Sequence, residues 1–229
     1  MTGFANRTDR LTELVQRVSV RRVATGEDQE DVAALRYRAY QAAGMIGAIP
    51  GKRLWDGYDE MPNARTVGVW RDDRLIASIR LHVAGAAHEA RSPAVLVFPE
   101  ILSPRLAAGD RIVDPNRLTV DPIAQREEPD VHMLLMRIAM AAAIYHAADI
   151  VTATVRPGHK AFYARWLHMT WVADPRPYPP LLRSLGLMTA QFQREKDAFL
   201  QKADFLRPES GEPERLFGPA AHGTINPTP

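Results

Sequence analysis

The chain of 229 residues contains no cysteine. This absence excludes disulfides, cysteine metal ligands and a cysteine nucleophile, and it is consistent with a reducing compartment. An excess of charge of one sign is also missing, because 29 Lys and Arg residues face 27 Asp and Glu residues, for a net charge of +2. So small an excess does not indicate nucleic-acid binding. The hydrophobic fraction of 46% is nevertheless enough to form a real core.

Long hydrophobic runs are missing as well. The most apolar stretch, residues 133–148, is interrupted by Arg137 and His146 and is too short and polar to cross a bilayer. Residues 1–10 lack the apolar segment of a signal peptide. We therefore expect a soluble, cytoplasmic protein without stable membrane insertion.

Two kinds of catalytic motif do not occur. The histidines are scattered and no His-x-x-x-His pair is found, so we expect no metal site. No Gly-x-Ser-x-Gly motif for a serine nucleophile occurs either. Chemistry on this chain would therefore proceed without a covalent enzyme intermediate.

Apolar periodicity predicts an α/β fold of the α+β type. The expected helices cover residues 8–18, 27–43, 131–147, 158–167 and 194–204, and the expected strands cover 19–24, 66–70, 74–83, 109–120, 150–155, 169–173 and 185–192. A meander of strands lies early, and helices alternate with strands late. This order predicts a mixed central sheet with helices on both faces.

The domain boundaries follow from the same pattern. Residues 1–18 form an N-terminal helical extension and residues 19–206 form one domain. From residue 207 to 229, Pro, Gly and Glu dominate, so this part is expected to be a flexible tail.

Charged and aromatic residues gather at particular places in this order. Asp114 and Arg117 lie three residues apart near the end of the strand that leads to the long apolar helix. The other members are Arg36, Arg38 and Tyr40 on the second helix, Trp55, Asp56 and Asp59 in the irregular loop 44–64, and Arg80 in a central strand. A loop of this length in a compact domain tends to be functional or mobile.

These residues and the order of the elements resemble the GNAT-like acyltransferases, and among them the acyl-homoserine-lactone synthases and the N-acyl amino acid synthases. The resemblance is carried by Arg36 with Tyr40, Asp56 with Asp59, Arg80, and Asp114 with Arg117, in that order. The segment from His159 to Arg165, with Phe162 and Tyr163, and the later Arg176-Pro-Tyr178-Pro are similar to the N-acyl amino acid synthases. The resemblance covers residues 19–178.

The resemblance implies a splayed pair of central strands and an N-acyltransferase. This enzyme would move a fatty acyl chain from the thioester of an acyl carrier protein to the amine of an amino acid, with no cofactor beyond an acyl-carrier or acyl-CoA co-substrate. Residues 125–130 contain no glycine where CoA-dependent acetyltransferases have a glycine-rich pyrophosphate loop, which favours the carrier protein as donor.

Two alternatives remain open at this point. An acyl-homoserine-lactone synthase would differ in its acceptor and in a lactonisation step. Met45 and Ile46 stand where those enzymes carry a second aromatic residue, and position 114 is Asp where they usually have Glu. A non-catalytic acyl-binding domain on the same fold is the other alternative.

The resemblance assigns roles to several residues. Asp114, beside Arg117, would accept the ammonium proton or orient the amine, unless the two form a structural ion pair. Arg36, Arg38 and Arg80 are candidates to hold the acceptor carboxylate, although Arg36 and Arg38 are two apart on a helix, so at most one is expected to reach a pocket. Asp56 and Asp59 would pair with these arginines.

The remaining candidates concern the thioester. Tyr163 would protonate the leaving thiolate, and backbone N–H groups after Val120 would stabilise the oxyanion where the strands splay. Arg126, Arg156 and Lys160 would dock an acidic carrier protein. Met133, Met136 and Met140 follow helical spacing and would line either the core or an acyl tunnel.

Overall fold

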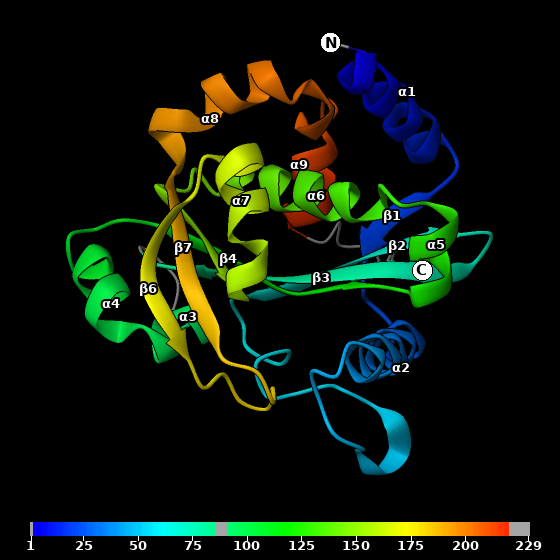
Figure 1. The fold of residues 1–229 in the computed structure, drawn as a ribbon, viewed down its shortest axis with the longest axis horizontal. Helices are drawn as coiled ribbons and strands as arrows, with labels where there is room; N and C mark the ends of the chain where they lie inside the picture. The colour runs from blue at the N-terminus through cyan, green and yellow to red at the C-terminus, as the bar shows by residue number, and fades with distance from the viewer. Residues whose placement is uncertain (1, 86–90, 220–229) are drawn as a thin grey trace, which may run out of the picture.

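A computed structural model describes residues 2–85 and 91–219 (Figure 1). In these residues seven strands form one sheet in the order β1-β2-β3-β4-β5-β7-β6. The strands are β1 (Ser19–Arg22), β2 (Ala64–Arg71), β3 (Arg74–Ala84), β4 (Ile112–Val120), β5 (Ile150–Val155), β6 (Thr170–Arg176) and β7 (Leu185–Gln191). Neighbouring strands are antiparallel except for β4 and β5, which are parallel.

Helices cover both faces of the sheet. They are α1 (Thr2–Gln16), α2 (Gly26–Ala42), α3 (Pro93–Val97), α4 (Pro99–Ala107), α5 (Pro122–Glu127), α6 (Val131–Tyr145), α7 (Lys160–Leu167), α8 (Phe192–Lys202) and α9 (Glu212–Phe217), with short 3-10 turns at η1 (Pro50–Lys52), η2 (Pro157–His159) and η3 (Asp204–Leu206). In Figure 1, α6 lies across one face of β3 and β4, and α2 lies across the opposite face. The predicted mixed sheet with helices on both faces is confirmed.

The longest apolar helix, α6, lies at the centre of the larger core. Most of its residues are hydrophobic, and Met133, Leu135 and Ile138 are almost fully buried. A helix that is apolar on most of its circumference must be covered on more than one side. Here β3 and β4 cover one side, and α1, η3 and α9 cover others. Within the described part of the chain, no helix is long and apolar enough to cross a membrane.

The segment 207–219 differs from the expected flexible tail. It contains α9, which packs against α6 and buries Leu216 and Phe217 in the main core. Arg137 of α6 also forms a 2.7 Å ion pair with Glu212 of α9. The many Pro, Gly and Glu residues of this segment indicated a tail, but Leu216 and Phe217 between them are enough to bind one short helix to the core. The rest of the expected tail, 220–229, lies outside the described residues.

The central strands β4 and β5 separate soon after they begin. Their parallel pairing consists of Ile112 with Ile150 and Val113 with Val151 in the described strands, although both strands continue for several more residues. The expected splayed strand pair is therefore confirmed, and the opening lies at the centre of the sheet.

Removing the apolar contact of α9 should destabilise the domain. We expect Leu216→Ala to lower the free energy of unfolding by about 3 kcal/mol, because Leu216 is completely buried and the substitution leaves a cavity. Urea unfolding followed by circular dichroism measures this change. Leu182→Ala is the control, since Leu182 is 67% exposed and its loss should change stability by less than about 0.5 kcal/mol. Equal stabilities of the two variants would show that α9 is not part of the core.

Candidate active site

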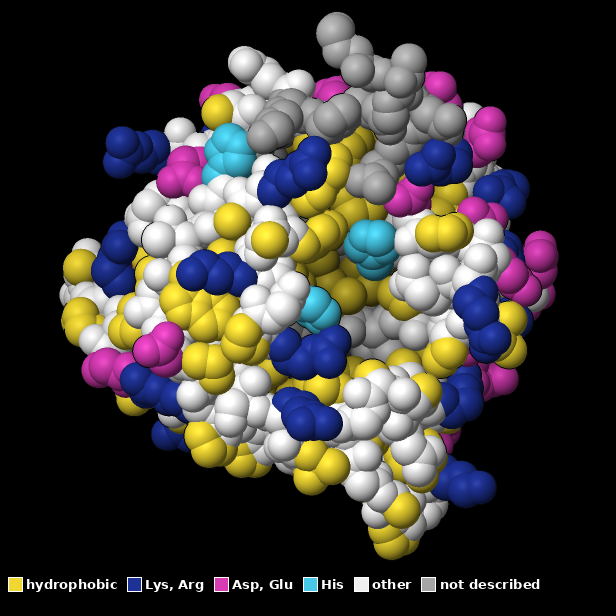
Figure 2. Space-filling model, viewed as in Figure 1, with side chains coloured by type: hydrophobic (Ala, Val, Ile, Leu, Met, Phe, Trp, Pro, Cys, Tyr) yellow, Lys and Arg dark blue, Asp and Glu magenta, His cyan; other side chains and the backbone are white. Residues whose placement is uncertain are grey.

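A cavity of about 590 Å³ occupies the opening between β4 and β5. Its walls include residues 115–120 of β4 and residues 151–156 at and after β5. Figure 2 shows a hollow near the centre of this face, with hydrophobic side chains inside it and Lys and Arg side chains around it. A cavity of this size is large enough for a small-molecule or cofactor site.

The cavity passes through the sheet and has two chemically different halves. On the α6 face its lining is apolar and includes Met136, Met140 and Phe192, while Arg156, His159 and Tyr163 line the cavity from the segment that follows β5 and continues into α7. On the α2 face the lining is aromatic and polar and includes Tyr40, Tyr58, Arg80, Asn116 and Tyr178. Met133, the third methionine of the predicted set, is buried in the core and does not line the cavity.

A bulge in β4 turns Arg117 into this cavity. Ser78 of β3 pairs with Thr119 and Arg80 pairs with Asn116, so two residues of β4 oppose one residue of β3. Arg117 adopts φ +49°, a left-handed conformation that is uncommon for residues other than glycine. Bulges of this kind redirect a side chain at functional sites. The guanidinium of Arg117 lies 5.7 Å from the ring centre of Tyr40.

Three arginines and two aspartates form a buried ion cluster beside the polar half. Asp59 binds Arg36 at 2.8 Å and Arg80 at 2.7 Å, and both side chains of the first pair are completely buried. Asp56 bridges Arg80 and Arg117 at 2.6 Å each. Burial opposes ionisation of Asp56, but attraction to the two arginines outweighs it and lowers its pKa to about 2. With three positive and two negative groups, the cluster carries a net charge of +1.

Asp114 does not join this cluster, contrary to expectation. Its carboxylate is completely buried and accepts hydrogen bonds from the backbone N–H of Ala94 and from Thr152 Oγ1, both at 2.9 Å. Asp114 is also not among the residues that line the cavity. The start of α3 covers it, so the carboxylate connects β4, β5 and α3 where the two strands begin to separate.

The other predicted residues either line the cavity or lie outside its lining. Those that line the cavity are Tyr40, Arg80, Arg117, Val120, Arg156 and Tyr163. Neither Arg36 nor Arg38 lines the cavity, since Arg36 lies in the buried ion cluster and Arg38 lies 3.5 Å from Asp121. Trp55 anchors the loop by donating to Glu60 and lies 5.3 Å from Arg36.

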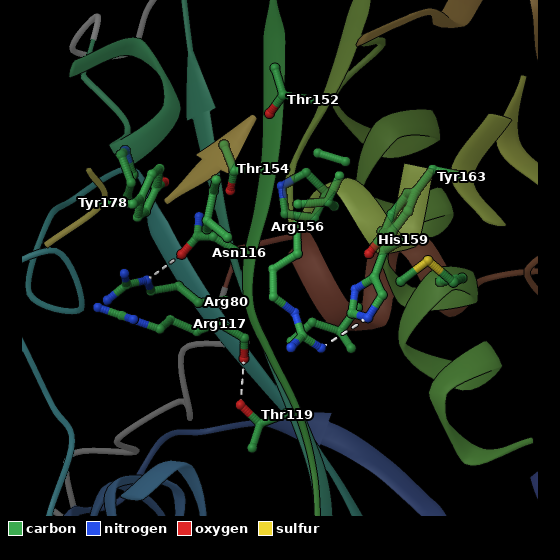
Figure 3. Close-up of a pocket in the computed structure, with 18 of the residues that line it drawn as sticks. Arg80, Asn116, Arg117, Thr119, Thr152, Thr154, Arg156, His159, Tyr163 and Tyr178 are labelled. Atoms are coloured by element: carbon green, nitrogen blue, oxygen red, sulfur yellow. Dashed lines mark hydrogen bonds between the residues drawn. The ribbon is translucent and has the colours of Figure 1, made fainter. Parts of the chain in front are cut away.

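Of the basic residues predicted to bind the carrier protein, only Arg156 lines the cavity. Arg156 lines it and donates to His159 Nε2 at 3.0 Å, whereas Lys160 lies over the ring of Trp171 and Arg126 donates to the backbone of its own helix. Figure 3 shows Arg80, Asn116 and Arg117 on one side of the cavity, and Arg156, His159 and Tyr163 on the other.

Sequence reasoning missed His82, Asn116 and His159. Asn116 lies between the two residues of the Asp114–Arg117 motif, and His82 lies two residues after Arg80 on the same strand. Since alternate residues of a strand share a face, His82 was recognisable as a neighbour of Arg80, whereas the position of Asn116 opposite Arg80 depends on the register of β3 and β4. His159 belongs to the segment already singled out, four residues before Tyr163.

Comparison with known proteins agrees with this geometry. Residues 31–191 match the family described as N-acyl amino acid synthase FeeM. Among solved structures, FeeM from uncultured soil microbes, an N-acyl amino acid synthase, is similar with 15% identity and a TM-score of 0.64, over 82% of this chain and 98% of that chain. No curated protein matches the sequence.

Two acyl-homoserine-lactone synthases have the same fold. LasI is similar with 14% identity and a TM-score of 0.56, over 77% of this chain and 91% of its own. The CoA-dependent synthase BjaI is similar with 16% identity and a TM-score of 0.55, over 80% of this chain and 85% of its own.

Stability should fall at mildly acidic pH because of His82. Burial lowers the pKa of this imidazole to about 4 in the folded protein, despite the opposing charge of Asp114. The unfolded chain has an ordinary value near 6.5 and binds more protons between these two pH values, so unfolding is favoured as pH falls through this window. We expect a loss of about 3 kcal/mol between pH 6.5 and pH 4.

Urea unfolding at several pH values, compared between the parent and His82→Gln, measures this contribution. The variant has no imidazole at this position and should lose less stability over the same window. If the free energy of unfolding falls equally with pH in both proteins, His82 is not the cause of the loss.

Proposed function

Because the match extends over most of its length, the chain belongs to the N-acyl amino acid synthase FeeM family and is an N-acyltransferase, and we propose that it transfers a fatty acyl chain from an acyl carrier protein to the amine of an amino acid. The observation that carries this proposal is the cavity through the split sheet. One half of it is apolar, and the other half adjoins an ion cluster with one excess positive charge.

The positive cluster suits the acceptor. An amino acid brings a carboxylate, and arginine can hold a carboxylate through two parallel hydrogen bonds. Arg80 and Arg117 both line the cavity while Asp56 and Asp59 hold them in place. An amine without a carboxylate would leave the excess charge of the cluster uncompensated.

The apolar half suits the acyl chain. Met136, Met140 and Phe192 offer a surface without charge on the α6 face. Methionine side chains are flexible and adapt to the shape of an apolar ligand. A chain entering between β4 and β5 therefore places its thioester in the split, with the acceptor on the opposite face.

The surroundings of the cavity favour a carrier protein over CoA as the donor. Asp121 accepts from the backbone N–H groups of Ile123 and Ala124 at 2.9 and 3.2 Å, so the first amides of α5 are already occupied. A diphosphate approaching them would meet this carboxylate.

In the described part of the chain, no carboxylate pairs with Arg126, Arg156 or Lys160. These cations are therefore available for the acidic surface of a carrier protein.

The proposed reaction needs no covalent intermediate. The amine nitrogen attacks the thioester carbonyl, the backbone N–H of Val120 stabilises the oxyanion, and the carbon–sulfur bond then breaks. The N–H groups after Val120 do not take part, because that of Asp121 donates to the carbonyl oxygen of Ile76 and those of Ile123 and Ala124 donate to Asp121. Burial raises the pKa of Tyr163 to about 12, so its hydroxyl keeps its proton at neutral pH and can give it to the leaving thiolate. The proton released from nitrogen passes through water to the Tyr163 oxygen, which restores the hydroxyl for the next turnover.

Mass spectrometry of a reaction mixture tests the function. The purified protein is incubated with a fatty acyl carrier-protein thioester, or with the matching acyl-CoA, and a mixture of amino acids. We expect an N-acyl amino acid from the carrier-protein donor. An acyl-homoserine lactone in extracts of producing cells would indicate the lactone synthase instead, and the absence of product with every acceptor would contradict the proposal.

Variants of the cluster then localise the acceptor. Arg117→Ala should raise the acceptor KM about tenfold or more, because a hydrogen bond between charged groups is lost, and should leave the donor KM unchanged. Arg38→Ala is the matched control, since Arg38 faces away from the cavity. Similar effects of both variants would place the acceptor elsewhere.

Tyr163→Phe tests the leaving-group step. We expect kcat to fall about tenfold or more, because the thiolate loses its proton donor, while both KM values stay near those of the parent. Tyr145→Phe, on α6 and outside the cavity lining, should retain full activity. An unchanged kcat in Tyr163→Phe would remove Tyr163 from the mechanism.

A further inference from the structure

The side chain of Asn116 has one possible orientation. Arg80 Nε lies 2.7 Å from Asn116 Oδ1, and an arginine nitrogen can only donate, so the amide atom that faces it must be the oxygen. Asn116 Nδ2 then faces the carbonyl oxygen of Asp114 at 2.8 Å and His82 Nδ1 at 3.1 Å. The first of these is an acceptor, which agrees with the orientation.

This orientation determines where His82 carries its proton. Since Asn116 Nδ2 donates, His82 Nδ1 must accept and is unprotonated. His82 Nε2 lies 3.0 Å from the carbonyl oxygen of Tyr58, which can only accept, so Nε2 carries the hydrogen. A second proton would place N–H against N–H at Nδ1. The hydrogen bonds therefore require a neutral imidazole.

The groups around His82 exert opposing effects on its charge. Asp114 and Asp59 favour protonation, whereas Arg80 and burial oppose it. The ring of Tyr58 packs edge-on against the imidazole with 6.3 Å between ring centres. Because the side chain is completely buried, burial outweighs the two carboxylates and agrees with the neutral form that the hydrogen bonds require.

We propose that His82 is a positioning residue for the acceptor carboxylate. The unprotonated Nδ1 of His82 accepts a hydrogen bond from the amide of Asn116 and helps to fix its orientation. The amide oxygen of Asn116 in turn holds the guanidinium of Arg80 toward the cavity. The bond to Tyr58 holds the loop that brings Asp56 and Asp59 to the same guanidinium. This role rests on the proposed function, because it acts through the arginine that would hold the acceptor.

Loss of the His82 imidazole would weaken the hydrogen bonds that lead from His82 through Asn116 to Arg80. If His82 cannot accept from Asn116, the amide keeps its bonds to Arg80 Nε and to the Asp114 carbonyl but loses its third contact, and one buried N–H of Asn116 is left without an acceptor. Arg80 then keeps its ion pairs with Asp56 and Asp59, but the amide oxygen that sets its position along β3 is held less firmly. The acceptor should bind more weakly, while the donor half on the α6 face stays unchanged.

Two substitutions of His82 separate this role from simple packing. Glutamine has one acceptor and one donor, so His82→Gln can accept from Asn116 and donate to Tyr58, whereas His82→Leu can do neither. With the amino acid that gives product with the parent, we expect His82→Leu to raise the acceptor KM about tenfold and leave the donor KM within about twofold. His82→Gln should restore the acceptor KM. Equal increases in both KM values, or an unchanged acceptor KM in His82→Leu, would overturn the proposal.

Nitrogen NMR of the parent protein supplies a test that needs no substrate and still applies if His82→Leu does not fold. Long-range proton–nitrogen correlations at pH 7 should identify His82 as neutral with its hydrogen on Nε2. A hydrogen on Nδ1, or an imidazolium, would overturn the proposal even if the enzyme is active. Absence of product with every amino acid would instead count against the proposed function, and the NMR result would still decide the arrangement of His82 and Asn116.

Discussion

The buried charges of Arg36, Arg80 and Asp59 impose the constraint on which the rest of the site depends. An ion removed from water costs several kcal/mol unless a partner of opposite charge and hydrogen bonds compensate for it. Arg36 comes from α2, Arg80 from β3 and Asp59 from the loop between α2 and β2, so these three segments must meet for any of the charges to be tolerated. The position of the loop, and with it one wall of the cavity, follows from this pairing.

The opening of the sheet depends on a second polar contact at its closed end. The last parallel pair of β4 and β5 is Val113 with Val151, and the next residues, Asp114 and Thr152, are joined through their side chains. Beyond this point the strands diverge. Asp114 thus keeps the two strands together where they begin to separate, while the bulge at Arg117 directs the next charged side chain into the space between them.

Patterns within single segments were predictable from the sequence, and the resemblance predicted the pairing of Asp56 and Asp59 with the arginines, but other contacts between distant segments were not predictable. The apolar periods predicted the seven strands and the long helices, and helical spacing predicted that Arg36 and Arg38 face different directions. The bonds from Asp114 to Ala94 and Thr152 depend on the short helix α3, which has no clear apolar period, and on the parallel register of β5. The sequence therefore did not show that Asp114 lies apart from the arginines, because the groups that bind it come from distant segments. Similarly, α9 is too short for its period to stand out, and its docking depends on space left beside α6.

The cluster also bears on how the acceptor loses its proton. In the described residues that line the cavity there is no carboxylate, and Asp114 lies outside it with both oxygens already bonded. A nearby positive charge lowers the pKa of an ammonium group, because it disfavours the charged form. The arginine cluster, with its net charge of +1, therefore favours an acceptor with an ionised carboxylate and a neutral amine over the zwitterion, which carries no net charge. Asp56, held ionised between Arg80 and Arg117, moderates this effect without accepting the proton itself. In this arrangement a site without a dedicated base can still present a nucleophilic nitrogen to the thioester.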